Sequence, residues 1–159
     1  MIALDARDLK ILAELMENAN ASFVEIGKKL DIHPNVVAYR INKLEQIGII
    51  KRYTTTLDLE KLGLSENICI GISFPDHTGR DDALKHIASI PQVTEVVSSL
   101  GNPEGMVYLV GKNKSEVDMV LSRMRDLNVK IEFTASIIKT YQDGLLSRFL
   151  RQQAEKMER

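Results

Sequence analysis

Residues 32–52, IHPNVVAYRINKLEQIGIIKR, mix apolar residues at helical spacing with Asn, Tyr, Arg and Lys. Val37, Ile41 and Leu44 recur every three or four positions, which is typical of a helix that buries one stripe. Gly48 is a natural stop, because glycine readily takes the backbone conformation that ends a helix. The stretch therefore predicts a surface helix with a polar outer side.

Two earlier segments also predict helices. Asp5 suits the N-cap of the first helix, whose apolar stripe consists of Leu9, Leu12 and Met16. Ser22 and Glu25 stand three apart, the spacing of a reciprocal capping box, and begin the second helix. Pro34 suits the first turn of the third, because its missing N–H would have no intrahelical partner there. The short connection between the second and third helices predicts a helix-turn-helix.

After Gly48 the pattern becomes that of strands. The run IIKRYTTTLDL is rich in β-branched residues and predicts a linker strand. In ICIGISF, residues 68–74, Ile and Phe alternate with smaller residues, as in a strand with one buried face. We expect further helices near 81–90 and 115–127, and strands near 93–100, 106–111 and 129–139. The order strand, helix, strand, strand, helix, strand predicts an α+β fold whose second half is a ferredoxin-like αβ-sandwich.

A four-stranded sheet with helices on one side leaves its other face open. We expect Val96, Leu109 and Ile138 on that face. Exposed apolar area of this extent usually meets a partner, so the sequence predicts dimerisation through the sheet. The final segment, DGLLSRFLRQQAEKMER, predicts an amphipathic helix with Leu145, Phe149 and Gln152 on one stripe. It either packs on the sheet unit or serves in assembly, and the sequence leaves both open.

The outer side of the helix over 34–46 has the chemistry that a DNA major groove requires. Amides pair with adenine edges, a small alanine permits close approach, and cations at the margin contact phosphates. The alternative is an ordinary solvated face, which is the usual role of such residues. We assign to the DNA surface His33, Asn35, Val36, Ala38, Tyr39, Arg40, Asn42, Lys43, Lys51 and Arg52.

Local charge favours the DNA interpretation. The 159-residue chain has a formal net charge of −1, so no global basic field indicates nucleic acid or a membrane. Between Ser22 and Arg52, however, six basic residues face three acidic ones, which gives +3. Cys69 is the only cysteine, which excludes an intrachain disulfide and favours a reducing compartment. With no signal peptide or transmembrane run in the sequence, we expect a cytoplasmic protein without a membrane partner.

Residues 4–63, LDARDLKILAELMENANASFVEIGKKLDIHPNVVAYRINKLEQIGIIKRYTTTLDLEKLG, closely resemble the N-terminal domain of the Lrp/AsnC family, the feast/famine transcription regulators of bacteria and archaea. The resemblance implies that 34–46 is the recognition helix, and that Arg40 combines an internal structural role with a phosphate contact. It also implies a C-terminal αβ-sandwich that dimerises, often assembles into octamers, and binds amino-acid effectors between dimers.

Four parts follow from this resemblance and from the patterns. They are a helix-turn-helix DNA-binding domain (1–50), a linker strand and hinge (51–64), an αβ-sandwich for effector binding and oligomerisation (65–141), and a C-terminal helical tail (142–159).

The sequence departs from the family pattern at two places. His33 stands where the family usually has a serine that caps the recognition helix, so either the cap is lost or His33 contacts a phosphate instead. The family's Gly-x-x-Asp turn is replaced by GNPEG, so the resemblance assigns effector binding to Gly101, Asn102 and Glu104, with Thr134 from the last strand. A carboxylate suits an effector's amino group, although GNPEG equally fits a plain turn between strands.

The sequence thus predicts a DNA-binding transcriptional regulator that reads a pseudo-palindrome as a dimer or higher oligomer, with no cofactor or metal. One alternative is an enzyme on the same architecture, such as a sirohaem decarboxylase, for which His33, His77 and His86 are the first candidates. No Ser/His/Asp spacing, phosphate-binding glycine loop or metal-ligand cluster supports catalysis. Another alternative is a sensing module that has lost DNA binding, against which the residues from Asn35 to Lys43 argue.

Overall fold

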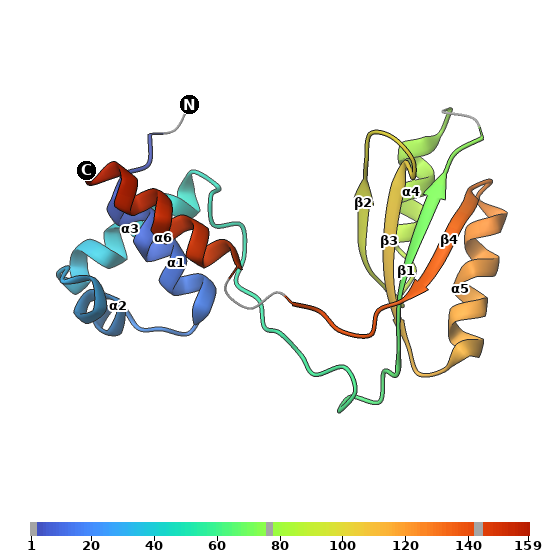
Figure 1. Cartoon of the computed structure of the whole chain (residues 1–159), viewed down its shortest axis with the longest axis horizontal. Coiled ribbons are helices and arrows are strands. Elements are labelled where there is room, and N and C mark those ends of the chain that lie inside the picture. The colour runs from blue at the N-terminus through green and yellow to red at the C-terminus, as the bar shows by residue number, and fades with distance from the viewer. Residues whose placement is uncertain (1–2, 76–77, 142–144) are drawn as a thin grey trace. The chain divides into compact units, whose positions relative to one another are not determined.

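The structure is a computed structural model, and it describes residues 3–75, 78–141 and 145–159. The chain divides into two units, Met1–Thr56 with Tyr141–Arg159, and Leu57–Thr140 (Figure 1). His77, one of the histidines considered above, lies outside the described residues. Within the described ranges, no helix combines the length and apolar character needed to cross a membrane.

The first three helices begin where their caps predict. They are α1 (Ala6–Glu17), α2 (Phe23–Leu30) and α3 (Pro34–Gln46). Asp5 Oδ1 accepts a hydrogen bond from the N–H of Asp8 at 2.9 Å, and Ser22 Oγ accepts one from the N–H of Glu25 at 3.2 Å. Both caps are reciprocal, which satisfies N–H groups that a helix start leaves unpaired.

The helix-turn-helix closes over a small apolar core of Ile11, Leu15, Ile26, Val37 and Ile41. Gly27 permits the close approach of α2 to the turn that follows it, because a Cβ there would lie 2.5 Å from the carbonyl oxygen of Ile32. The predicted stripe of α3 is therefore buried, and its opposite side remains in solvent.

The last helix, α6 (Leu145–Met157), packs along α1. Its buried side chains are the small Ser147 and Ala154, which let the two helices approach closely. The predicted stripe is wrong, because Phe149 is 52% exposed; the side chain of Leu145 lies outside the description. Of the two arrangements left open by the sequence, packing on the sheet unit is wrong, since α6 packs on α1 in the first unit; a role in assembly stays a prediction.

Ion pairs and hydrogen bonds between side chains fix α6 on α1. Arg151 Nη2 donates to Glu14 Oε1 at 2.9 Å and to Glu17 Oε2 at 2.8 Å, and Nη1 also donates to Glu17. Ser147 Oγ donates to Glu17 Oε1 at 3.1 Å, and Lys10 Nζ to Glu158 Oε1 at 2.6 Å. The hydrogen bond from Arg151 lowers the pKa of Glu17 to about 2.

The second unit has the predicted sandwich order. Its elements are β1 (Glu66–Ser73), α4 (Arg80–Ala88), β2 (Val93–Ser98), β3 (Gly105–Gly111), α5 (Lys114–Asp126) and β4 (Lys130–Ser136). The strands form an antiparallel sheet in the order β2-β3-β1-β4. Both helices pack on the same side of it, on a core that includes Ile70 of β1, Ile87 of α4 and Met124 of α5.

The prediction of which residues lie on the open face of the sheet is wrong. Leu109 is fully buried, and Val96 packs partly buried against the same core, so both face the helices. Ile138 is 97% exposed, but it lies beyond the end of β4. Because GMVYLVG is apolar at nearly every position, its composition does not reveal which alternate residues point toward the helices.

The register identifies the true open face. One cross-strand row on it runs Val97, Met106, Gly71, Phe133, since each pairs with the next. A Cβ at Gly71 would collide with the ring of Phe133, so the glycine lets this ring lie over it. Phe133 is 40% exposed, and Val97 is 38% exposed. This row of the open face is therefore apolar, as expected of that face, but other residues form it.

The linker strand predicted for IIKRYTTTLDL, residues 49–59, is also not formed in the single chain. Residues 51–58 have no strand assignment, and their side chains are exposed. A β-branched run favours extended backbone, but a strand also needs a neighbouring strand to bond with, and none pairs with this segment within the described chain.

Replacing Arg151 with Ala should loosen α6 from α1 and lower the melting temperature of the first unit at pH 7 by roughly 2–8 °C. The stabilisation from Glu17 is present above its unfolded pKa of 4.5 and is lost as the pH falls through about 2. Thermal melts followed by circular dichroism should therefore show the difference between variant and wild type shrinking between pH 5 and about pH 2. Arg148→Ala, an exposed change on the same helix, is the control; equal melts for Arg151→Ala and Arg148→Ala would refute this role.

Candidate nucleic-acid interface

The outward side of α3 is polar and accessible. Asn35, Tyr39, Asn42 and Lys43 are all exposed, and the Tyr39 side chain is 67% exposed. Asn35 and Asn42 are seven residues apart and therefore lie along one line of the helix. Of the other residues assigned to this surface, Val36 is 38% exposed and Ala38 is half-buried. The structure thus brings the predicted groove-facing side chains together on one surface.

His33 caps α3 itself. Its Nδ1 accepts a hydrogen bond from the N–H of Asn35 at 3.2 Å, so the capping interaction survives without a serine. An accepting Nδ1 must hold a lone pair, which places the proton of the neutral ring on Nε2. The exposed ring therefore presents one N–H donor at the N-terminal end of α3, where phosphates are favourably bound.

Arg40 is occupied inside the first unit. Its Nη1 lies 2.7 Å from both carboxylate oxygens of Asp5 and 2.7 Å from Oδ1 of Asp8. Its side chain is 19% exposed, and that of Asp8 is 8% exposed. Partial burial raises the pKa of Asp5, but the hydrogen bonds from Arg40 and from the backbone N–H of Asp8, together with the positive charge of Arg40, outweigh it and leave the pKa below its usual value. We call these three residues the Arg40 clamp; they tie α3 to the first turn of α1.

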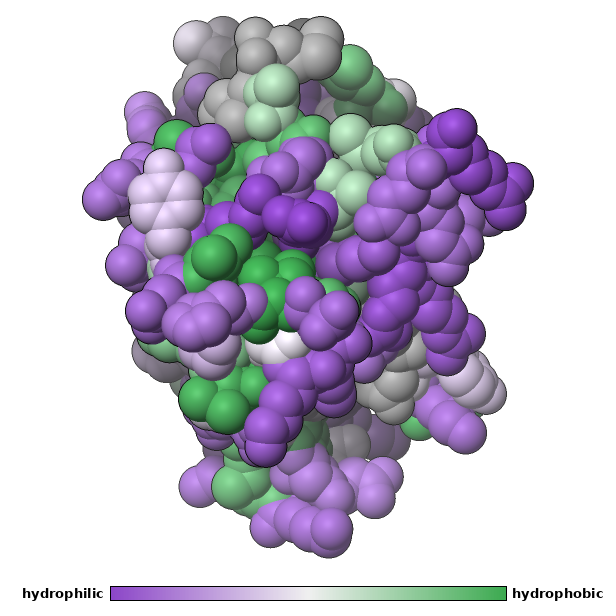
Figure 2. All heavy atoms as spheres, turned by 90° about the vertical axis from the view of Figure 1, so that its left-hand side faces the viewer, coloured by the Kyte–Doolittle hydropathy of each residue, from purple (hydrophilic) through white to green (hydrophobic). Residues whose placement is uncertain are grey.

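Further cations follow α3. Lys51 and Arg52 are exposed and follow the end of the helix within a few residues. Tyr53 OH donates to Glu45 Oε1 at 2.8 Å; burial and this bond raise the pKa of Tyr53 to about 12, so the phenol remains neutral. Figure 2 shows the side of the first unit that lies on the left of Figure 1, which is mostly hydrophilic around a smaller apolar area.

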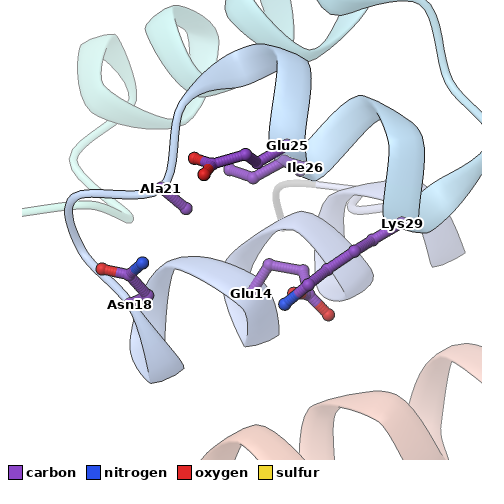
Figure 3. A pocket seen from close by; sticks show the side chains of 6 residues that line it. All are labelled: Glu14, Asn18, Ala21, Glu25, Ile26 and Lys29. Atoms are coloured by element: carbon purple, nitrogen blue, oxygen red, sulfur yellow. The ribbon is translucent and has the colours of Figure 1, made fainter.

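A small hollow lies between α1 and α2 (Figure 3). Its volume is about 120 Å³, and its lining residues are Glu14, Asn18, Ala21, Glu25, Ile26 and Lys29. Lys29 Nζ donates to Glu14 Oε2 at 2.8 Å, and Figure 3 shows the two side chains meeting. Pockets for drug-sized ligands have volumes of roughly 300–1,000 Å³. The hollow is therefore too small for such a ligand. It lies beside the ion pair of Lys29 and Glu14, which joins the two helices.

The turn between β2 and β3 is held by Arg80, at the start of α4. Arg80 Nη2 donates to Ser98 Oγ at 2.9 Å, to the carbonyl of Ser99 at 2.9 Å and to the carbonyl of Glu104 at 2.7 Å. The N–H of Ser99 also donates to the carbonyl of Glu104 at 2.9 Å. Gly101 has a φ of +110° within this turn. One guanidinium thus fixes the turn from the helix side.

Glu104 is engaged at both carboxylate oxygens. Oε2 accepts from the N–H of Phe74 at 2.8 Å, and Oε1 lies 3.8 Å from Arg80 Nη1. Thr134 is exposed on β4 opposite Ile70. Because β1 lies between β3 and β4, Thr134 and the turn come from strands on opposite sides of β1. Within one chain, the four residues assigned to effector binding do not converge on one point.

The remaining histidine candidate has a local role. His86 Nδ1 lies 2.7 Å from the carbonyl oxygen of Asp82, one turn earlier on α4. Among the residues that the structure describes, no group of three or more His, Cys, Asp or Glu side chains is arranged to hold a metal ion.

Comparison with known proteins identifies the architecture. Residues 4–51 match the winged helix-turn-helix DNA-binding family. The transcriptional regulator AzlB of Bacillus subtilis is 32% identical over 114 residues, which cover 70% of this chain and 73% of AzlB. The regulatory protein AsnC of Haemophilus influenzae is 27% identical over 135 residues, 85% of this chain and 90% of AsnC. This chain belongs to the Lrp/AsnC family of transcriptional regulators.

A solved structure has the same fold. The feast or famine regulatory protein of Mycobacterium tuberculosis, determined in complex with L-methionine, superposes with a TM-score of 0.81 at 24% identity. The superposition covers 89% of this chain and 97% of that one. The predicted α+β architecture, a helix-turn-helix followed by an αβ-sandwich and a C-terminal helix, is thus confirmed for this Lrp/AsnC chain.

Sequence reasoning missed Arg80 and Arg151. Arg80 lies in TGRDD, with no neighbouring motif that indicates contact with a turn some 20 residues later. Arg151 contacts Glu14 and Glu17, more than 130 residues away. Both contacts exist only because the fold of this Lrp/AsnC chain brings distant segments together. The residues next to Arg80 and Arg151 in the sequence therefore do not indicate these contacts.

Replacing Arg40 with Ala should lower the free energy of unfolding by about 1–3 kcal/mol, because it leaves the buried carboxylate of Asp8 without its charged partner. Urea unfolding followed by helical circular dichroism measures this loss. Lys43→Ala, an exposed change on the same helix, should leave stability within about 0.5 kcal/mol of wild type. A stable Arg40→Ala protein would show that the clamp has no structural role.

Proposed function

We propose that this Lrp/AsnC regulator binds pseudo-palindromic double-stranded DNA in the cytoplasm as a homodimer or higher oligomer, without catalysis, and that an amino acid or related small molecule modulates it. The observation that best supports DNA binding is the exposed polar face of α3. The Arg40 clamp and the His33 cap hold this helix in place. A fixed helix with an accessible face is what sequence reading in a groove requires.

Two roles divide the DNA surface. Asn35, Val36, Ala38, Tyr39 and Asn42 are candidates for base contacts, because amides, methyl groups and a phenol distinguish base edges. Contacts to phosphates suit His33, Lys43, Lys51 and Arg52, which carry donors or positive charge but no sequence code. The occupied guanidinium favours the structural role for Arg40 over a phosphate contact.

Dimerisation through the open sheet face follows from its apolar row of Val97, Met106, Gly71 and Phe133. An uncovered apolar sheet face of a water-exposed domain usually meets a partner. A second copy related by a two-fold axis would present an identical row, and an assembly of such dimers gives an octamer. Two-fold proteins read two-fold operators, whose half-sites are about one helical turn of DNA, or a multiple of it, apart.

The turn containing Gly101, Asn102 and Glu104 is the proposed effector site, with Thr134 supplied from β4. Two related structures support an amino acid: the Mycobacterium tuberculosis protein, and a transcriptional regulator from Neisseria meningitidis at 22% identity, were both determined with L-methionine. A carboxylate has about four acceptor sites, so Glu104 can receive an ammonium group in addition to its contacts with Phe74 and Arg80. Since Thr134 and the turn are separated by β1, the proposal requires a neighbouring copy to bring them together.

For the DNA surface, Tyr39→Ala and Asn42→Ala should each change which sequence is preferred, at a cost of about 1–3 kcal/mol on the preferred site. Lys43→Ala should instead weaken all DNA by a similar factor and reduce the salt dependence. Fluorescence anisotropy on a selected duplex and a scrambled one, from 0.05 to 0.3 M salt, separates the two classes. If all three variants lose the same factor on both duplexes, the assignment of roles is wrong.

For assembly, Phe133→Lys places a charge in the apolar row and should convert the assembly toward monomers in sedimentation velocity at micromolar concentration. Leu62→Lys, at a position that is 56% exposed outside the sheet, is the matched control and should sediment like wild type. A wild-type protein that sediments as a monomer would contradict dimerisation altogether.

For the effector, titration calorimetry with a panel of L-amino acids should give binding to the wild-type protein, and Glu104→Gln should weaken it by about tenfold, because a charge-assisted hydrogen bond to an ammonium group becomes a neutral one. Glu95→Gln, an exposed change on β2, is the control. Binding that is equal in wild type and Glu104→Gln would place the effector elsewhere.

A further inference from the structure

The base preference of α3 can be argued from which of its side chains are available. The helix contains one arginine, Arg40, whose Nη1 is 2.7 Å from Asp5 and from Asp8. Arginine paired to O6 and N7 is the commonest specific contact to guanine in the major groove. Because the Arg40 clamp pairs this guanidinium with two aspartates, α3 has no arginine available to bind guanine.

The available side chains have different chemistry. Asn35 and Asn42 are exposed and lie on one line of α3. A carboxamide pairs with N6 and N7 of adenine, because it offers one acceptor and one donor in the matching order. Seven residues of helix span about 10 Å, which equals about three base-pair steps. Val36, next to Asn35 and 38% exposed, suits the methyl group of a thymine.

We infer that α3 selects A·T base pairs at two positions about three base pairs apart, one read by Asn35 and the other by Asn42. Val36 packs on a thymine methyl beside the first position. Lys43 is the one exposed cation of α3, and we assign it to phosphate, as its point charge suits. The inference rests on the proposed function, since it specifies which bases the regulator reads.

Selection of duplexes from a random pool by the full-length protein, at ~0.15 M salt because salt sets non-specific affinity, provides the sites. Adenine is then replaced by 7-deazaadenine, which lacks N7, and thymine by deoxyuridine, which lacks the methyl group, one position at a time. Enriched A·T pairs at two positions about three base pairs apart in each half-site are expected. At the position read by Asn42, 7-deazaadenine should lower wild-type affinity by about tenfold.

Variants assign each effect to its residue. The loss with 7-deazaadenine should vanish at one position in Asn42→Ala and at the other in Asn35→Ala, and the loss with deoxyuridine should vanish in Val36→Ala. Gln152→Ala, which removes an exposed amide from α6, is the control. This variant should lose affinity for all three modified duplexes as the wild type does. Circular dichroism verifies that each variant folds.

The opposing outcomes are distinct. No enrichment over the starting pool would overturn the proposed function, and this inference with it. Enriched G·C pairs at the two positions, lost in Lys43→Ala, would leave the regulator in place and overturn the base assignment. Enriched A·T pairs whose affinity ignores both modified bases would also overturn it, because the preference would then come from DNA shape.

Discussion

The ion pairs of Arg40 with Asp5 and Asp8 determine what α3 can present to a partner. They join the middle of α3 to the first turn of α1, where the same two aspartates also form the capping box. One cluster therefore starts α1, holds α3 and turns the guanidinium away from solvent. The remaining outward residues of α3 are amides, a phenol, a lysine and small apolar groups, and this set gives the helix its recognition chemistry.

A second set of ion pairs extends the first unit to the end of the chain. Glu14 and Glu17 of α1 bind Arg151 of α6, and Glu14 also binds Lys29 of α2. Glu14 is buried at 7% exposure, and although burial raises its pKa, the hydrogen bonds from Lys29 and Arg151 outweigh this and lower it. Because residues 141–159 belong to the first unit, the sheet unit is an insertion between α3 and α6 in the order of the chain.

Local chemistry explains why much of this fold was predictable. The Asp5 and Ser22 caps, the Pro34 start and the strand expected over residues 68–74 are each specified within a few residues, and the structure has the three helix starts and the strand β1. The burial along β1 does not alternate, because residues 68–72 are all buried. The errors concern distant contacts. The facing of Leu109 depends on its register with Ile68, and α6 buries Ser147 and Ala154 because α1 lies beside it. Within the site, the exposed face of α3 was predictable from its period, whereas the hold of Arg80 on the turn was not.

Hydroxyl-radical footprinting of the full-length protein, with and without a bound duplex, tests most directly whether α3 contacts DNA. Tyr39 and Tyr141 are matched reporters, because their side chains are 67% and 74% exposed and only Tyr39 lies on α3. With binding confirmed by gel shift, DNA should reduce the oxidation of Tyr39 several-fold and leave that of Tyr141 unchanged. Unchanged oxidation of Tyr39 in a saturated complex would contradict the account, because the polar face of α3 would then be exposed to solvent while DNA is bound elsewhere.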